Sequence, residues 1–148
     1  MYLVFGSCLR TLMAMVICMA CGKSNQGDVR VRRRMGTAAV FVRICQSCGH
    51  ELEWCSQPQE SRLSLGNLKL AAGLFFSGCK PVKGLNMLRN IGVAMISYRT
   101  FTQYQRLYII PAVYRLWDLQ RTAIVEAARA AGGVLRLAGD ARCDSPGK

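Results

Sequence analysis

The apolar and polar residues of this chain change their spacing partway along the sequence. In the first half, residues 28–34 (DVRVRRR), 37–44 (TAAVFVRI) and 50–55 (HELEWC) alternate or are rich in branched and aromatic residues. This pattern is typical of half-buried strands. The MGT sequence at 35–37 suits a turn. The pattern therefore predicts two antiparallel strands joined by this turn, followed by a third short strand.

Beyond residue 65 the apolar positions recur with helical spacing. Leu68, Ala71, Ala72 and Phe75 lie at i, i+3, i+4 and i+7, which predicts one face of a helix. Gly78 suits the end of this helix, and the proline three residues later suits the start of the next. We expect the face of that second, short helix to consist of Val82, Leu85, Leu88 and Ile91.

Two more helices are expected after Gly92. Ser97 is a suitable N-cap for a helix over residues 98–109, because its hydroxyl oxygen can accept a hydrogen bond from the first turn. Pro111 should kink or restart that helix. The helix that follows should end at Gly132 and place these apolar residues on one face: Val113, Leu116, Trp117 and Ile124.

These patterns together predict an α+β fold. The chain has 148 residues, which is enough for one ordinary domain or two very small ones. Half of these residues are apolar, so the chain can bury a core. The expected regions are an apolar lead segment or helix over 1–17, a β-unit over 18–56, a polar linker over 57–65, a helical bundle over 66–131 and a terminal strand with an acidic turn over 132–148.

Four of the eight cysteines form two CxxCG units that flank the first two expected strands. We name residues 18–22 the first knuckle and residues 45–49 the second knuckle. Two thiolates separated by two intervening residues can both reach one ion, and the glycine permits the turn after the second cysteine. The pattern predicts a zinc ribbon with a structural Zn²⁺, because four thiolates leave no position open for water. The expected ligands are Cys18, Cys21, Cys45 and Cys48.

Other interpretations of the cysteines stay open. The thiols can instead form disulfides, or lie unpaired in an ordinary core. His50 can replace one ligand, although beside four cysteines a surface role or a role behind the ligands is the commoner one. Cys55 is a weaker ligand candidate for the same reason.

The charge balance favours a polyanionic partner. Lys and Arg number 20 against 8 for Asp and Glu, which favours nucleic acid over a membrane, although a basic surface can also serve solubility alone. We expect the third helix of the bundle to face a DNA groove, in a helix-turn-helix arrangement. A plain helical bundle with basic outer faces is the alternative. The expected DNA contacts are Arg30, Arg32, Arg33, Arg34, Lys83, Arg89, Arg99, Gln103 and Arg106, with Lys80 as a further backbone contact.

Aromatic residues of the third helix are expected in the core instead of at a base-stacking surface. Phe101, Tyr104 and Tyr108 lie at i, i+3 and i+7 of the same helix.

The apolar run from Leu12 to Ala20 raises a different possibility, a signal peptide. The preceding residues carry no charge before Arg10, and cleavage after the run would split the first knuckle. The run is too short to span a membrane. A small secreted cysteine-rich protein therefore stands as the alternative to a zinc-binding one, and a ribbon that binds proteins instead of DNA is a third.

The final residues, GDARCDSPG, resemble the GGDxRxDSPGHSAKYG segment of animal transposase-derived proteins related to Mutator-like, DDE-type transposases. The resemblance extends over nearly the whole chain, in the order of that family. It is carried by YLVFGSCL, the two knuckles, WCSQP, GNLKLAAGLFFSG, SYRTF and YIIPAVYRLW.

The resemblance implies a zinc-binding and helical DNA-recognition region before an RNase H-like nuclease core, in a nuclear protein. In such cores carboxylates hold Mg²⁺ ions that activate the attacking oxygen. Asp140 would correspond to the first metal-binding carboxylate, with Asp144 in reserve. Lys148 stands where that family has histidine, and the other carboxylates are missing. We therefore expect a catalytically incomplete fragment, in which Mg²⁺ belongs only to an intact parent enzyme.

Overall fold

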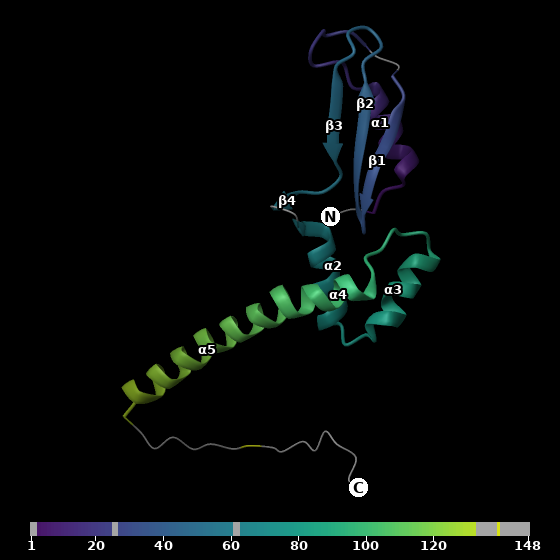
Figure 1. Cartoon of the computed structure of the whole chain (residues 1–148). Coiled ribbons are helices and arrows are strands. Elements are labelled where there is room, and N and C mark those ends of the chain that lie inside the picture. Colours follow the sequence, from purple (N-terminus) through teal and green to yellow (C-terminus); the bar gives the residue numbers. More distant parts are fainter. Residues whose placement is uncertain (1–2, 25–26, 61–62, 133–138, 140–148) are drawn as a thin grey trace. The chain divides into compact units, whose positions relative to one another are not determined.

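The computed structural model describes residues 3–24, 27–60, 63–132 and 139, and it has the α+β composition predicted from the sequence. The chain divides into two compact units, Met1–Ile109 and Ile110–Lys148. The first unit contains a small antiparallel sheet and the helices α1 to α4, and the second contains the long helix α5 (Figure 1). Each unit is described by itself below.

The sheet confirms the three strands expected from the alternating pattern. The strands are antiparallel and follow the chain order β1-β2-β3. The β1–β2 connection is the MGT turn, where Gly36 has a φ of 61°. This turn lies at one end of the sheet and both knuckles lie at the other (Figure 1). The strands are β1 (Val29–Met35), β2 (Ala38–Ile44) and β3 (Glu51–Cys55).

A β-bulge interrupts β1. The pairing passes from Val31 opposite Phe41 directly to Arg33 opposite Val40, so Arg32 is the extra residue. A bulge bends its strand and redirects a side chain. Here it breaks the simple alternation of the DVRVRRR segment and leaves three consecutive arginines exposed.

Helix α1 (Gly6–Met15) covers one face of the sheet, in agreement with the helix expected near the N-terminus. Its Met13 is buried together with Val29 and Phe41. The ring of Trp54 extends this cluster, because its centroid lies 5.9 Å from that of Phe41. The buried apolar side chains of this layer are few, so the sheet needs a second source of stability.

The segment expected to be a polar linker contains two very short paired strands, β4 (Gln59–Glu60) and β5 (Leu63–Ser64). Helix α2 (Leu65–Phe76) begins directly after β5. The polar composition of this stretch gave no signal for strands, because segments of two residues are too short to show an alternating pattern.

The helices α2, α3 (Pro81–Asn90) and α4 (Tyr98–Tyr104) surround a second core. The expected end of α2 and the expected N-cap of α4 are confirmed. Gly78 has a φ of 67°, and Ser97 Oγ accepts a hydrogen bond from the Thr100 backbone N–H at 3.1 Å. The expected inner face of α2 packs against this core, whose buried members are Ala71, Leu85, Ile96, Phe101 and Ile109.

The expected inner face of α3 is partly wrong. Leu85 is buried and Leu88 is half-buried as expected, but Val82 and Ile91 are exposed, and Gly84 is buried although it was not predicted to be. The reason is a close approach between helices: a β-carbon on Gly84 would lie 2.5 Å from Leu74 Cδ2. The glycine lets α3 approach α2 at this position, so Gly84 and Leu85 form the contact, whereas Val82 lies in the first turn of α3 and Ile91 follows its last residue.

Between α4 and α5 (Ile110–Ala130) the chain forms a π-helical turn, η1 (Gln105–Ile109). Pro111 explains the wider turn, because it has no N–H to donate and its ring would clash with the carbonyl four residues earlier. Phe101 is buried as expected and Tyr104 is half-buried, but Tyr108 is 42% exposed, so its assignment to the core is wrong.

Helix α5 ends close to the position expected from the sequence, just before Gly132 with its φ of 62°. None of its residues is buried, and its apolar face of Leu116, Trp117 and Ile124 is exposed. No helix in the described part of the chain is both long and apolar enough to cross a bilayer. The expected terminal strand over 132–148 lies almost wholly outside the described residues.

A buried asparagine joins the sheet to the helices. Asn67, at the start of α2, accepts hydrogen bonds from the Thr37 backbone N–H at 2.8 Å and from the Thr37 hydroxyl at 2.7 Å. Its Nδ2 donates to the Met35 carbonyl at 2.7 Å. The β1–β2 turn is thereby held against α2. A β-carbon on Gly36 would lie 2.5 Å from Ile96, so the turn approaches the helical core too closely for any side chain there.

The substitution Asn67→Ala should lower the free energy of unfolding by about 1–3 kcal/mol, because it leaves buried donors and an acceptor without partners. Urea denaturation of the metal-loaded protein measures this loss. The matched control is Asn90→Ala, at the exposed end of α3, which should change stability by less than about 0.5 kcal/mol. Equal stability of the two variants would contradict the role given to Asn67.

Candidate metal centre

The two knuckles fold in the same way. In the first, the Gly22 N–H donates to the Cys18 carbonyl at 2.8 Å, and the Cys18 N–H donates to the Lys23 carbonyl at 3.0 Å. In the second, the Gly49 N–H donates to the Cys45 carbonyl and the Cys45 N–H donates to the His50 carbonyl, both at 2.9 Å. Gly22 and Gly49 have φ values of 68° and 72°, which a side chain would disfavour.

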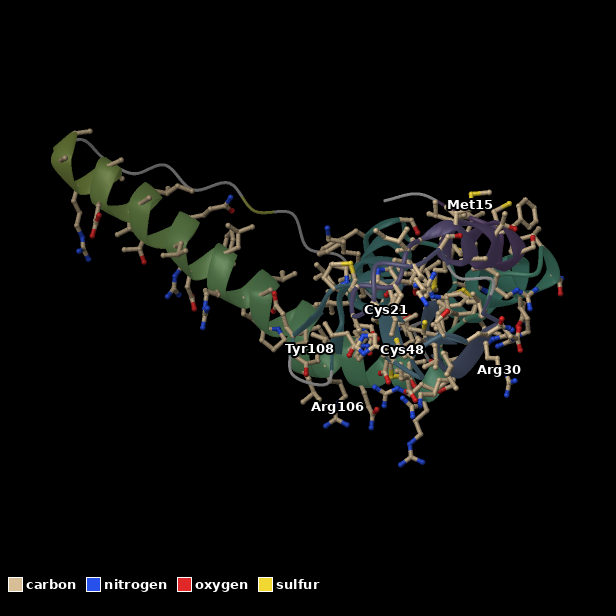
Figure 2. The ribbon with its side chains drawn as sticks, turned by 90° about the horizontal axis from the view of Figure 1, so that it is seen from above. Met15, Cys21, Arg30, Cys48, Arg106 and Tyr108 are labelled. Carbon is tan, nitrogen blue, oxygen red and sulfur yellow. The ribbon has the colours of Figure 1, made fainter. Side chains whose placement is uncertain are left out.

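The repeated geometry brings the four predicted cysteines together. Cys18 Sγ lies 3.7 Å from Cys48 Sγ, and Cys21 Sγ lies 3.8 Å from Cys45 Sγ. All four sulfurs lie within 4.8 Å of one another. Figure 2 shows Cys21 and Cys48 reaching this cluster from the two different knuckles.

These separations fit a metal ion better than disulfides. A tetrahedral ion with metal–sulfur bonds of about 2.3 Å separates its sulfurs by about 3.8 Å, whereas a disulfide bond is about 2.05 Å long. No cysteine in the part of the chain that the structure describes is in a disulfide. The prediction that these four cysteines could hold one metal ion is therefore confirmed in its geometry.

The knuckle backbone favours the charged form of the first cysteine in each pair. In the first knuckle, the backbone N–H groups of Cys21 and Ala20 donate to the Cys18 sulfur and lower the pKa of that thiol to about 6. In the second knuckle, burial acts to raise the pKa of Cys45. The backbone N–H groups of Cys48 and Ser47 outweigh burial, so the pKa of Cys45 is lowered. Thiolates that are already favoured by their own backbone are ready metal ligands.

The fourth sulfur shows why a cation is needed. The His50 backbone N–H favours the Cys48 thiolate, but the neighbouring Cys45 sulfur and burial together raise the pKa of Cys48 to about 12. Four thiolates so close together repel one another, so Cys48 stays protonated unless a bound cation offsets that repulsion.

The two reserve ligands are not part of the cluster. His50 is exposed, and among the described residues the cluster consists of cysteines alone. The half-buried Cys55 instead accepts a hydrogen bond from Gln59 Nε2 at 3.2 Å. The arrangement therefore has four ligands of one kind, as the spacing predicted.

A buried arginine beside the knuckles was not predicted. Arg43 is only 2% exposed and lies on β2, two residues before the second knuckle. Its guanidinium donates to the carbonyls of Met13, at 2.7 Å, of Val16, and of Ile17, at 3.2 Å. These carbonyls belong to the end of α1 and the residues just before the first knuckle. Arg43 therefore holds the approach to one knuckle against the strand that leads into the other.

The arginines expected to contact DNA on β1 have unequal surroundings. Arg30 pairs with Asp28 at 2.8 Å, and both side chains are largely exposed. Arg32, at the bulge, pairs with Glu51 and Glu53 at 2.6 and 2.5 Å. Arg33 and Arg34 are exposed and form no ion pair within the described residues. The positive charge of two of these four arginines is therefore compensated by neighbouring carboxylates.

The helical segment Leu65–Ile109 differs, because it contains no Asp or Glu at all. The predicted DNA contacts in it are exposed, including Gln103, and Figure 2 shows Arg106 projecting from its helix. No salt bridge compensates a charge of this segment within the described chain. Its six exposed basic residues are Lys69, Lys80, Lys83, Arg89, Arg99 and Arg106. Asp140 and Asp144, the expected vestigial carboxylates, lie outside the described residues.

Replacing a knuckle cysteine should abolish tight metal binding. Cys21→Ser and Cys48→Ser should each weaken Co²⁺ binding by more than about tenfold and lose the absorption of a four-thiolate site. Cys79→Ser is the matched control, since Cys79 is an exposed cysteine on the α2–α3 connection. Co²⁺ titration followed by absorption spectroscopy measures both effects. Full binding by the Cys48→Ser variant would contradict the four-cysteine centre.

Arg43→Met should weaken Co²⁺ binding by about 10- to 100-fold without removing a ligand, because the carbonyls that position the first knuckle lose their donors. Arg43→Lys should recover part of the affinity. Arg33→Met, an exposed arginine on the neighbouring strand, should leave the affinity unchanged. An unchanged affinity in Arg43→Met would show that the knuckles position themselves.

Comparison of the chain with protein-family models, with curated proteins and with solved structures finds no significant match. The resemblance to transposase-derived proteins therefore remains an expectation from sequence motifs. The functional assignment below rests on the geometry of the metal centre and on the distribution of charge.

Proposed function

We propose that this chain is a zinc-stabilised DNA-binding module derived from a transposase-like protein, acting by binding and not by catalysis. The observation that carries the DNA-binding part is the segregation of charge. Six exposed basic residues lie on a helical segment that has no carboxylate, whereas the sheet pairs part of its arginines with acids.

Zinc is the metal that this centre suits best. Four thiolates in tetrahedral arrangement select Zn²⁺ or an iron–sulfur cluster. The four sulfurs lie as close together as the ligands of one ion, which favours a single Zn²⁺. Two CxxCG knuckles at the end of a three-stranded antiparallel sheet are what the proposed zinc ribbon requires. The ion would be structural, since its coordination would be complete.

DNA is favoured because its phosphates supply the charges that the helical segment lacks. Exposed lysines and arginines release counterions when they contact phosphates, which drives binding without regard to sequence. The proposed localisation is the nucleus, as the resemblance implies. That resemblance also supports a transposase-derived origin, in which Asp140 and Asp144 would be remnants of a nuclease.

A protein-interaction module is the second candidate, and the exposed apolar face of α5 favours it. Leu116, Trp117 and Ile124 are each more than half exposed. Competition with bulk duplex DNA separates the two functions. Bulk DNA should displace a labelled duplex from the chain but should leave a bound protein partner in place. The secreted alternative requires oxidised thiols and loss of roughly the first 20 residues, which would split the first knuckle and which mass spectrometry of the expressed chain would detect.

The affinity of the zinc-loaded chain for duplex DNA should fall steeply as salt rises. With three to six phosphate contacts, log K should fall with log salt at a slope of about −3 to −5. Fluorescence anisotropy with a labelled duplex between about 50 and 200 mM salt measures the slope. Replacing Lys80, Lys83 and Arg89 by alanine should make it shallower by about 3, whereas Arg30→Ala, which removes an arginine already paired with Asp28, should have less effect. A flat slope for the unaltered chain would contradict the proposal.

A further inference from the structure

The connection between α2 and α3 is short and tightly folded. It consists of Ser77–Lys80, and the left-handed Gly78 reverses the chain within it. The Ser77 N–H donates to the Gly73 carbonyl at 3.0 Å, and the Cys79 N–H donates to Ser77 Oγ at 3.3 Å. A turn of three or four residues containing glycine is typical of two helices in a helix-turn-helix unit.

The inner face of α3 fixes which of its residues turn outward. Leu85 is buried in the core, Leu88 is half-buried, and Gly84 packs so closely on Leu74 that a β-carbon would clash with it. A helix held in this way cannot rotate about its axis without losing that contact. Its outer face is therefore set by the fold.

The outer face of α3 has residue types that suit the edges of base pairs. Lys83, Asn86, Met87 and Asn90 lie at i, i+3, i+4 and i+7, and all four are exposed. Asparagine can form two hydrogen bonds to adenine in the major groove, and apolar groups contact the thymine methyl. This gives a role to Met87, which is 57% exposed on a helix that has apolar packing elsewhere.

Basic residues lie on both sides of this face. Lys80 precedes α3, and Arg89 in its last turn donates to Asn86 Oδ1 at 2.8 Å. Since no carboxylate occurs anywhere in the helical segment, nothing in it would repel a phosphate backbone on either side of α3.

Helix α4, the groove-facing helix expected from the sequence, suits this role less well. It has only seven residues before the π turn. Arg99 and Gln103 lie within α4, but Arg106 lies in the π turn, where the angular spacing of residues changes. Its exposed polar residues therefore do not continue as one regular helical face, and they are better placed to contact phosphates.

We infer that α3 is the recognition helix and that Asn86 and Met87 contact base edges in the major groove of duplex DNA. This inference rests on the proposed DNA-binding function and names the part of the surface that gives it sequence preference. Lys80, Lys83 and Arg89 then hold the flanking phosphates. Double-stranded RNA is disfavoured, because its deep and narrow major groove does not admit a helix.

The test selects preferred sites from a pool of duplexes with about 10 randomised base pairs, using the full zinc-loaded chain. The unaltered protein should enrich a defined sequence. Asn86→Ala and Met87→Ala are neutral changes, so they should keep the salt slope and the affinity for bulk DNA. Each should reduce the preference for the selected sequence at one base pair by roughly 5- to 150-fold.

The matched control is Gln103→Ala, an equally exposed and neutral change on α4, which should keep the selected sequence unchanged. Zinc content and circular dichroism establish that each variant is folded. Loss of preference in Gln103→Ala and not in Asn86→Ala would overturn the assignment to α3 in favour of α4.

Two further outcomes separate this inference from the proposed function. Salt-dependent binding without any enriched sequence would overturn the inference and leave the DNA-binding function standing. Tighter binding to a matched RNA duplex than to DNA, or no binding to any duplex, would overturn both.

Discussion

Four sulfur atoms within 4.8 Å of one another are the constraint on which the sheet depends. Among the residues that the structure describes, the apolar cluster between α1 and the sheet has three buried members, Met13, Val29 and Phe41, which is little for an independent layer. The metal centre closes the end of the sheet opposite the β1–β2 turn and joins segments 24 to 30 residues apart in the sequence. Binding of a metal ion by these four cysteines would therefore be coupled to folding of this part.

The sequence was sufficient wherever a single residue type or a simple period determines the local structure. The knuckle cysteines, the three strands, Gly78, Pro81 and the Ser97 cap were all predictable in this way, because each depends on neighbours within a few residues. The clustering of the four cysteines was predictable because each pair has the local CxxCG spacing and the strands between the pairs form a hairpin.

What escaped prediction depends on contacts between distant segments. Nothing in the sequence distinguishes the buried Arg43 from the exposed arginines of β1, since its partners are carbonyls of another element. The bulge at Arg32 and the burial of Gly84 against Leu74 likewise follow from strand pairing and helix approach. Asn67 reads as an ordinary polar residue until the turn that it holds is placed beside it.

The same distinction separates the residues that hold the fold from those proposed to bind. The β1–β2 turn tolerates almost no alternative, because a β-carbon at Gly36 would meet both Ile96 and Asn67. The outer face of α3 is exposed, so packing constrains its side chains little. If the proposed DNA binding holds, a gene lineage carrying this module can change the outer face of α3 while its turn stays fixed, since selection for binding and selection for folding act on different codons.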